Sequence, residues 1–368
     1  LKVIAERHNL VCLLHEKPFK GVNGSGKHNN WSLSSDTGVN LLEPGNSPQD
    51  NVQFLIFLCA MIKAVDEYSD LLRISISSYS NDFRLGGAEA PPAIVSIYLG
   101  QEIMSILEAI ERGEIYTRQR RNFEIGLNVI PSFPCDTSDR NRTSPFAFTG
   151  NKFEFRMVGS SQSIASPNMI LNTIAAQALK EFADELENFA EPSKHLNELL
   201  VKTIKKHKKV IFNGNSYSDD WVKEAQKRGL YNFKTSVDAL DHSLDEKNVK
   251  LFEIHGVLSR RELSSRYEIH LENYCKMVHI EAKTLASMVK NEILPATSKY
   301  TKTLCDTVIT KQSLSCECFA EKETLKYLSE LSGRLYKDLN TLIAVNDEAN
   351  KTGDAVKRAQ RILAIPDL

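Results

Sequence analysis

The sequence lacks the features that mark several large classes of protein. Its 368 residues carry 46 Lys and Arg against 47 Asp and Glu, so no excess of charge favours nucleic acid or an anionic membrane as a partner. The longest apolar run, residues 54–62, ends at Lys63 and is far too short to span a bilayer. With 42% hydrophobic and 25% charged residues, the composition is typical of a soluble globular protein.

The seven cysteines are not arranged in a way that predicts a zinc site or a disulfide framework. No two of them form a C-x-x-C pair, and the closely spaced Cys316 and Cys318 have no second pair to complete a site. An odd number of cysteines at irregular spacing favours reduced thiols. We therefore expect a cytoplasmic protein.

The chain also lacks an initial Met. It starts at Leu1 in a helix-like pattern over residues 2–8, and it stops at Leu368, shortly after Pro366. No targeting segment can be read from such a start, and we expect the chain to be a fragment truncated at both ends.

A glycine-rich stretch, residues 15–32, reads HEKPFKGVNGSGKHNNWS. Glycine lets the backbone approach a ligand closely, and successive N–H groups can form an anion site. Residues 21–27 fit a P-loop, but His28 stands where that motif needs Ser or Thr, and a strand-like pattern follows instead of a helix. We expect the stretch to form the tip of a β-hairpin between a buried strand, residues 10–14, and a returning strand, residues 31–35.

A second segment, residues 75–92, combines helix-breaking glycines and prolines with charged side chains. The Gly86-Gly87 and Pro91-Pro92 pairs make a helix implausible and place Arg84 and Glu89 in a loop. From composition alone, an ordinary surface turn is the alternative to a functional loop.

A third segment, residues 152–157, alternates charged and apolar side chains. In a strand, residues two apart share a face, so Lys152, Glu154 and Arg156 are expected to line up opposite an apolar face. Taken alone, the pattern also fits a half-solvated strand with a surface ion triplet.

These segments together resemble the glutamine synthetase family. The pattern KPF-x-G-x-NGSGKH-x-x-x-S-L within residues 17–33 is similar to the ATP-binding signature of the type III branch. Arg84-Leu85 and Glu89-Ala90-Pro91 resemble the family's glutamate-binding and flap motifs. The sequence KFEFR, from Lys152, is similar to the family's R-I-E-V-R strand, and the sequence NRT, from Asn141, is similar to its N-R-S motif.

The resemblance implies a role for each matching residue. It implies metal binding by His28 and Glu154; glutamate binding by Asn23, Gly24, Arg84 and Arg156; ATP binding by Asn30, Trp31, Ser32, Arg142 and Lys152; and catalysis by Glu89 and Arg142. Two positions depart from the commoner family pattern: Asn30 replaces a second His, and Ala147 replaces an ATP-side Arg.

The resemblance also implies an α+β fold. We expect an antiparallel-sheet half-barrel catalytic core with flanking helices over residues 1–192, followed by a mostly helical C-terminal region over residues 193–368. In that region, leucines recur every three or four residues, as in a packed helix or coiled coil; they are Leu325, Leu328, Leu331, Leu335, Leu339 and Leu342.

The implied activity is the ATP-dependent ligation of ammonia to the γ-carboxylate of L-glutamate through a γ-glutamyl phosphate. Mg²⁺ or Mn²⁺ would be the cofactor and ATP the co-substrate, in a double-ring dodecamer with active sites between subunits. Two alternatives stay open: an inactive glutamine-synthetase-like assembly protein, and a related ligase that uses another amine.

Overall fold

The computed structural model describes residues 1–87, 90–116, 122–123, 133–134, 143–187, 189, 192–363 and 365. The chain divides into two compact units, Leu1–Ser264 and Ser265–Leu368. None of the helices in these described residues is long and apolar enough to cross a membrane. The predicted domain boundary at 192/193 remains a prediction, because spatial compactness is a different criterion from the division of the family into domains.

A four-stranded sheet lies in the first unit, with strand order β1-β6-β5-β2. The strands are β1 (Gly26–Trp31), β6 (Phe153–Gly159), β5 (Phe146–Phe148) and β2 (Ile97–Tyr98). The β1–β6 and β5–β6 pairs are antiparallel, whereas β2 and β5 are parallel, so this sheet is mixed. The short strands β3 (Asn122–Phe123) and β4 (Phe133–Pro134) form a separate antiparallel pair. The observed fold is thus α+β, as predicted.

Strand β6 confirms the predicted alternation of side chains. Phe153, Phe155 and Met157 are completely buried, and Phe146 on β5 stacks on Phe153 with ring centroids 4.6 Å apart. Their apolar surface holds the sheet against the helices. The charged face of β6 is also partly covered, because Arg156 is only 4% exposed.

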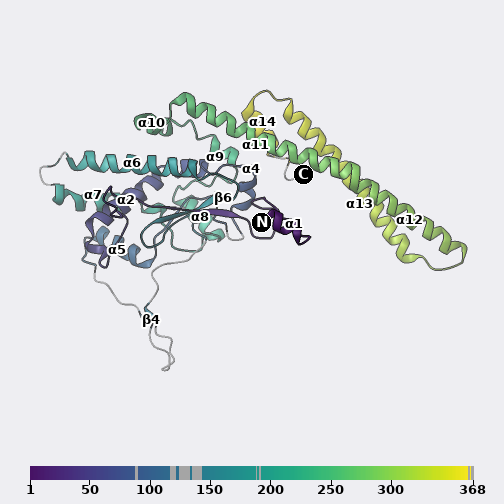
Figure 1. Ribbon diagram of the computed structural model, residues 1–368, viewed down its shortest axis with the longest axis horizontal. Coiled ribbons are helices and arrows are strands. Elements are labelled where there is room, and N and C mark those ends of the chain that lie inside the picture. Colours follow the sequence, from purple (N-terminus) through teal and green to yellow (C-terminus); the bar gives the residue numbers. More distant parts are fainter. Residues whose placement is uncertain are drawn as a thin grey trace. The chain divides into compact units, whose positions relative to one another are not determined.

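Helices cover this sheet and form most of the core of the first unit. Helix α2 (Val52–Glu67) packs against α6 (Ala165–Glu187) and α7 (Pro192–His207) (Figure 1). Asn51 caps α2, since its side-chain oxygen accepts a hydrogen bond from Phe54 N at 3.1 Å. The other helices of this unit are α1 (Lys2–Arg7), η1 (Pro48–Asp50), α3 (Ser69–Ile74), α4 (Tyr79–Arg84), α5 (Gln101–Arg112), η2 (Lys208–Val210), α8 (Asp219–Lys227), α9 (Ser236–Leu240) and α10 (Glu246–Ile254).

The predicted β-hairpin at the glycine-rich loop is wrong. Residues 10–14 form no strand, and Leu10 and Val11 are 64% and 85% exposed. Strand β1 begins inside the loop at Gly26 and pairs with β6, which lies far away in the chain. A short apolar run becomes a buried strand only if another strand covers it, and nothing in the described residues does so here.

The exclusion of a helix from residues 75–92 is also wrong. Helix α4 occupies residues 79–84, and the Ser78 side chain caps it by accepting a hydrogen bond from Asn81 N at 3.3 Å. The glycine pair follows this helix rather than interrupting it, so the breakers mark its end.

The second unit consists of long helices. Helix α11 (Arg260–Met288) continues through a π-helical turn, η3 (Val289–Ile293), into α12 (Leu294–Ser313), and α13 (Phe319–Asn350) returns along α12 to α14 (Ala355–Ile362) (Figure 1). The π turn ends at Ile293, two residues before Pro295, which has no N–H to donate to the hydrogen-bond ladder of the helix. Of the predicted leucine series, Leu339 and Leu342 are buried, whereas Leu331 is 39% exposed.

A buried ion pair joins α3 to α4 in the first unit. Arg73 Nη2 donates to Asp82 Oδ1 at 2.8 Å, and Ser236 N donates to Asp82 Oδ2 at 2.6 Å. Burial raises the pKa of Asp82, and the nearby charge of Arg73 and the hydrogen bonds from Ser236 only partly oppose this rise. Desolvation therefore outweighs the favourable interactions of the Asp82 carboxylate at this site.

The pair predicts an asymmetry between single and double substitutions. Asp82→Ala should lower the free energy of unfolding by about 3–5 kcal/mol, because Arg73 is left charged and buried without its carboxylate. The double variant Arg73→Met/Asp82→Leu should stay close to the wild type. Urea denaturation measures both, with the exposed Glu114→Ala as a control that leaves the midpoint unchanged. An Asp82→Ala protein as stable as the control would contradict this account.

Candidate functional site

The antiparallel pairing of β1 with β6 brings two predicted metal ligands into contact. His28 Nδ1 lies 2.7 Å from Glu154 Oε1. The register places Asn30 opposite Glu154 and is irregular between Lys27 and Asn29, so His28 sits at the irregularity. Such an irregularity redirects a side chain, which allows His28 to reach Glu154 along the sheet.

The second oxygen of Glu154 is held by Arg156. Arg156 Nε and Nη2 donate to Glu154 Oε2 at 2.9 and 2.7 Å. Burial raises the pKa of Glu154, but the hydrogen bonds and charge of Arg156, together with His28, outweigh it and hold the pKa below its usual value. Glu154 is therefore an anion at neutral pH, with one oxygen fixed by Arg156 and the other facing His28.

The His28–Glu154 pair has donors that suit a divalent cation. The His28 side chain is 46% exposed and that of Glu154 is 16% exposed, so both can be reached from solvent. Carboxylate oxygens and imidazole nitrogens both serve as ligands of divalent metal ions in proteins. Within the described ranges no group of three or more His, Cys, Asp or Glu residues could hold a metal, so this part of the chain offers two protein ligands.

Arg84 packs directly against the glycine-rich loop. A Cβ added at Gly24 would lie 2.6 Å from Arg84 Cγ, and one at Gly26 would lie 2.5 Å from Arg84 Nη1. The close approach of the arginine therefore favours glycine at both positions, since a side chain there would displace Arg84. Arg84 Nε donates to Asn81 Oδ1 at 2.8 Å, and Nη2 donates to the main-chain oxygen of Arg156 at 3.3 Å.

Arg84 is a buried cation. It is 3% exposed, and burial lowers its pKa to about 10, although the charge of Glu16 acts in the opposite direction. Its two hydrogen-bond acceptors above are both neutral oxygens. A buried guanidinium in such surroundings is stabilised by an additional anion.

The predicted ATP-side residues lie at the other end of β1. Asn30 is exposed, whereas Trp31 is buried and donates through Nε1 to Asn172 Oδ1 at 2.8 Å. Ser32 Oγ donates to Asn40 Oδ1 at 2.8 Å. The side chains of Trp31 and Ser32 thus anchor the end of the strand, and Lys152, half-buried, directly precedes β6.

The structure therefore brings four of the predicted residues into one cluster: His28, Glu154, Arg156 and Arg84. Asn23 and Gly24 lie in the loop above Arg84, with Asn23 exposed. Glu89 and Arg142 lie outside the described residues.

Sequence reasoning missed two residues of this cluster, Glu16 and Asn81, which are 2% and 0% exposed. Asn81 Nδ2 donates to the main-chain oxygens of Ile76 and Met157, both at 3.0 Å, so it fixes α4 to β6. No local pattern marks either residue, because their burial depends on contacts between distant segments.

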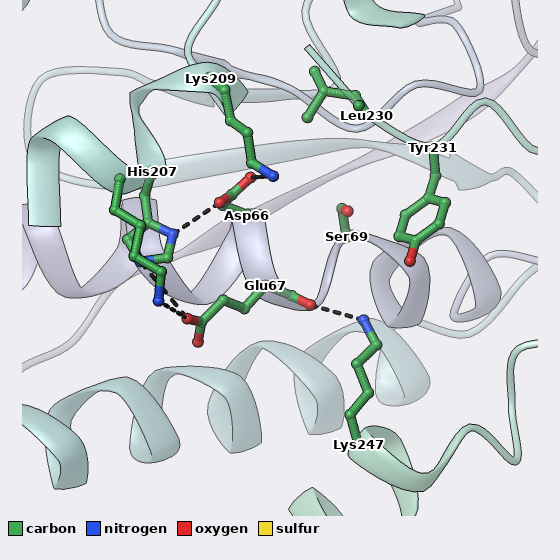
Figure 2. A pocket seen from close by; sticks show the side chains of 10 residues that line it. Asp66, Glu67, Ser69, His207, Lys209, Leu230, Tyr231 and Lys247 are labelled. Atoms are coloured by element: carbon green, nitrogen blue, oxygen red, sulfur yellow. Dashed lines mark hydrogen bonds and ion pairs between the residues drawn. The ribbon is translucent and has the colours of Figure 1, made fainter.

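A separate cavity of about 320 Å³ lies beside α2 and α7, and none of the predicted site residues lines it. Figure 2 shows Asp66 and Glu67 directed toward basic side chains around it. His207 Nδ1 lies 2.8 Å from Asp66 Oδ2, and Lys247 Nζ donates to the main-chain oxygen of Glu67 at 2.8 Å. Each of the two carboxylates contacts more than one basic side chain, so the group acts as an ionic network that joins helices.

Comparison with known families matches two parts of the chain. A family model described as "Glutamine synthetase, catalytic domain" matches residues 1–96, and one described as "Glutamine synthetase C-terminal domain" matches residues 195–312. The first match includes His28 and Arg84. Strand β6, which carries Glu154, lies outside both matches and joins the site through its pairing with β1.

Three curated relatives align over most of the chain. They are "Glutamine synthetase" from Butyrivibrio fibrisolvens (43% identical over 98% of this chain), "Type-3 glutamine synthetase" from Dictyostelium discoideum (47% over 84%) and "Glutamine synthetase" from Bacteroides fragilis (39% over 88%). The alignments cover 52%, 42% and 45% of these relatives, so the chain spans about half their length. With both domains of the family matched and these relatives aligned, the chain belongs to the glutamine synthetase family.

Proposed function

We propose that the whole protein joins ammonia to the γ-carboxylate of L-glutamate at the expense of ATP, through a γ-glutamyl phosphate, and is of type III. The observation that carries the proposal is the His28–Glu154 contact of 2.7 Å, beside two buried arginines and a glycine-rich loop. In this proposal His28 and Glu154 would share a cation, and the two buried guanidinium groups beside them would pair with an anion. The names of the aligned relatives support the same reaction.

His28 and Glu154 would hold Mg²⁺ or Mn²⁺. When bound, the cation neutralises negative charge on the phosphates during transfer. Arg156 prepares Glu154 for this role, since it fixes one carboxylate oxygen and keeps the group ionised. The other oxygen remains directed at the position shared with His28.

Arg84, Arg156 and the loop residues Asn23 and Gly24 would bind glutamate. Both arginines are buried, so a carboxylate brought to them would interact more strongly than at an open surface. Arg142 would neutralise the phosphoryl group in transfer. These contacts position the γ-carboxylate for attack on ATP, which is the main requirement of phosphoryl transfer.

ATP would bind at the end of β1 near Asn30, Trp31, Ser32 and Lys152. Because Trp31 and Ser32 side chains already bond to Asn172 and Asn40, their contribution would come from the main chain. Asn30 and Lys152 offer side chains for direct contacts.

Glu89 would remove a proton from ammonium. Ammonium has no lone pair, so one proton must leave before nitrogen attacks the acyl phosphate. A carboxylate is a weak base in water, but it can attract the cation and accept its proton in a closed, dry site. The adjacent Gly86-Gly87 pair suits a loop that closes.

The larger architecture belongs to the same proposal. The sheet of the described residues would form part of a half-barrel catalytic core, and residues 193–368 a type III C-terminal region. The assembled protein would be a cytoplasmic double-ring dodecamer, with active sites between subunits.

The metal site predicts a specific loss in Glu154→Gln. The amide keeps the shape of Glu154 but lacks its charge, so the Mn²⁺ dissociation constant of the full-length protein should rise at least about tenfold. Electron paramagnetic resonance of free Mn²⁺ measures this directly. Glu43→Gln, at an exposed position, is the control and should bind Mn²⁺ normally. Unchanged Mn²⁺ affinity in both Glu154→Gln and His28→Asn would exclude the site.

The proton-transfer role predicts that Glu89→Ala separates the two half-reactions. In the full-length enzyme, glutamine formation should fall by about a hundredfold or more, as expected for loss of a general base. ATP and metal binding should persist, together with slow glutamate-dependent release of phosphate from the acyl phosphate. Near-normal glutamine production at neutral pH would show that Glu89 is not the base.

A further inference from the structure

A buried carboxylate that has no role in the reaction proposed above lies beneath the glycine-rich loop. Glu16 is 2% exposed and lies near the start of the glycine-rich stretch, five residues before Gly21. Burial raises the pKa of Glu16, but hydrogen bonds from Ser161 and Ser80 outweigh this effect and hold the pKa below its usual value. Glu16 is therefore a buried anion at neutral pH, and its stability depends on the donors around it.

The donors to Glu16 come from different parts of the fold. Ser161 N donates to Glu16 Oε1 at 3.0 Å, and the Ser161 hydroxyl donates to the same oxygen. Ser80, whose side chain also hydrogen-bonds to the carboxylate, lies on α4. The main-chain oxygen of Glu16 accepts a hydrogen bond from Ser25 N at 2.7 Å. One residue thus connects the turn after β6, the helix that carries Arg84, and the loop.

Glycines around Glu16 show how little space is left. A Cβ at Gly159 would lie 2.9 Å from Glu16 Oε1, and a Cβ at Gly24 would lie 2.8 Å from the Glu16 main-chain oxygen. The same Cβ would lie 2.6 Å from Arg84 Cγ. The loop backbone at Gly24 is consequently packed against both Glu16 and Arg84, and small displacements of either residue would move the loop.

Glu16 and Arg84 also carry charges of opposite sign. Among the charged groups that favour the protonated form of Arg84, Glu16 contributes most. The direct hydrogen-bond acceptors of Arg84 described above are neutral, so this charge matters at a site shielded from water.

We propose that Glu16 is a positioning residue of the substrate site, which fixes the glycine-rich loop, α4 and the turn after β6 relative to one another and offsets the charge of Arg84. The inference rests on the proposed function, in which Arg84 and the loop bind glutamate. Glu16 then controls glutamate affinity without touching glutamate, and it does so more than it controls ATP affinity.

Kinetics of Glu16→Gln in the full-length enzyme test this role. The glutamate KM should rise about tenfold or more, because the amide loses the charge and cannot accept both Ser161 hydrogen bonds as strongly. The ATP KM should change by less than about twofold. Glu16→Asp keeps the charge and should recover part of the affinity, whereas the exposed control Glu6→Gln should match the wild type.

Hydrogen exchange tests the anchoring independently of turnover. Amides of residues 22–26 and 159–161 should exchange faster in Glu16→Gln than in Glu6→Gln, and unchanged rates would refute the anchoring. The positioning role would be refuted if the wild type is active and the Glu16→Gln variant has the same glutamate KM but a smaller fraction of folded protein. A wild-type protein without ligase activity would refute the proposed function instead. The exchange rates alone would then test whether Glu16 anchors the loop.

Discussion

The pairing of β1 with β6 is the constraint on which the site depends. It joins segments more than a hundred residues apart, and its register places the end of the glycine-rich loop against the charged strand. Gly26 lies opposite Gly159 in this register, and neither glycine has room for a side chain, because Arg84 fills one side and Glu16 the other. The loop can therefore approach both charges only because glycine occupies both strand positions.

The charged residues of the cluster are connected in series, with the two arginines in the middle and a carboxylate at each end. Glu154 on β6 is fixed by Arg156, the main-chain oxygen of Arg156 accepts from Arg84, and Arg84 is balanced at longer range by Glu16. Each anion lies near a cation, so none requires a shifted protonation state to remain buried. Such an arrangement leaves the exposed side of His28 and Glu154 as the place where a further charge can be added.

Features of the fold can be predicted from the sequence where a short stretch of residues determines them. The alternation in β6 was predictable, because a strand with one apolar face repeats every two residues. The hairpin prediction was wrong because it rested only on the apolar character of residues 10–14. It did not take into account whether another segment covers them. The glycine pair conceals helix α4 in the sequence, because it suggests that no helix forms nearby, whereas the cap at Ser78 allows a single short helix that ends before Gly86. The pairing of His28 with Glu154 came from the family resemblance, since no local pattern connects them, and no pattern in the glycine-rich stretch assigned a role to Glu16.

The number of ligands places a further requirement on the metal site. Mg²⁺ demands near-octahedral coordination by about six donors. In the proposed site His28 and Glu154 would supply two, because hydrogen bonds from Arg156 already occupy the second oxygen of Glu154. The remaining donors must then be water, phosphate oxygens of the nucleotide, or carboxylates from outside the described residues. A cation held by only two side chains binds weakly without these additions, so metal and nucleotide are expected to bind together, each increasing the affinity of the other.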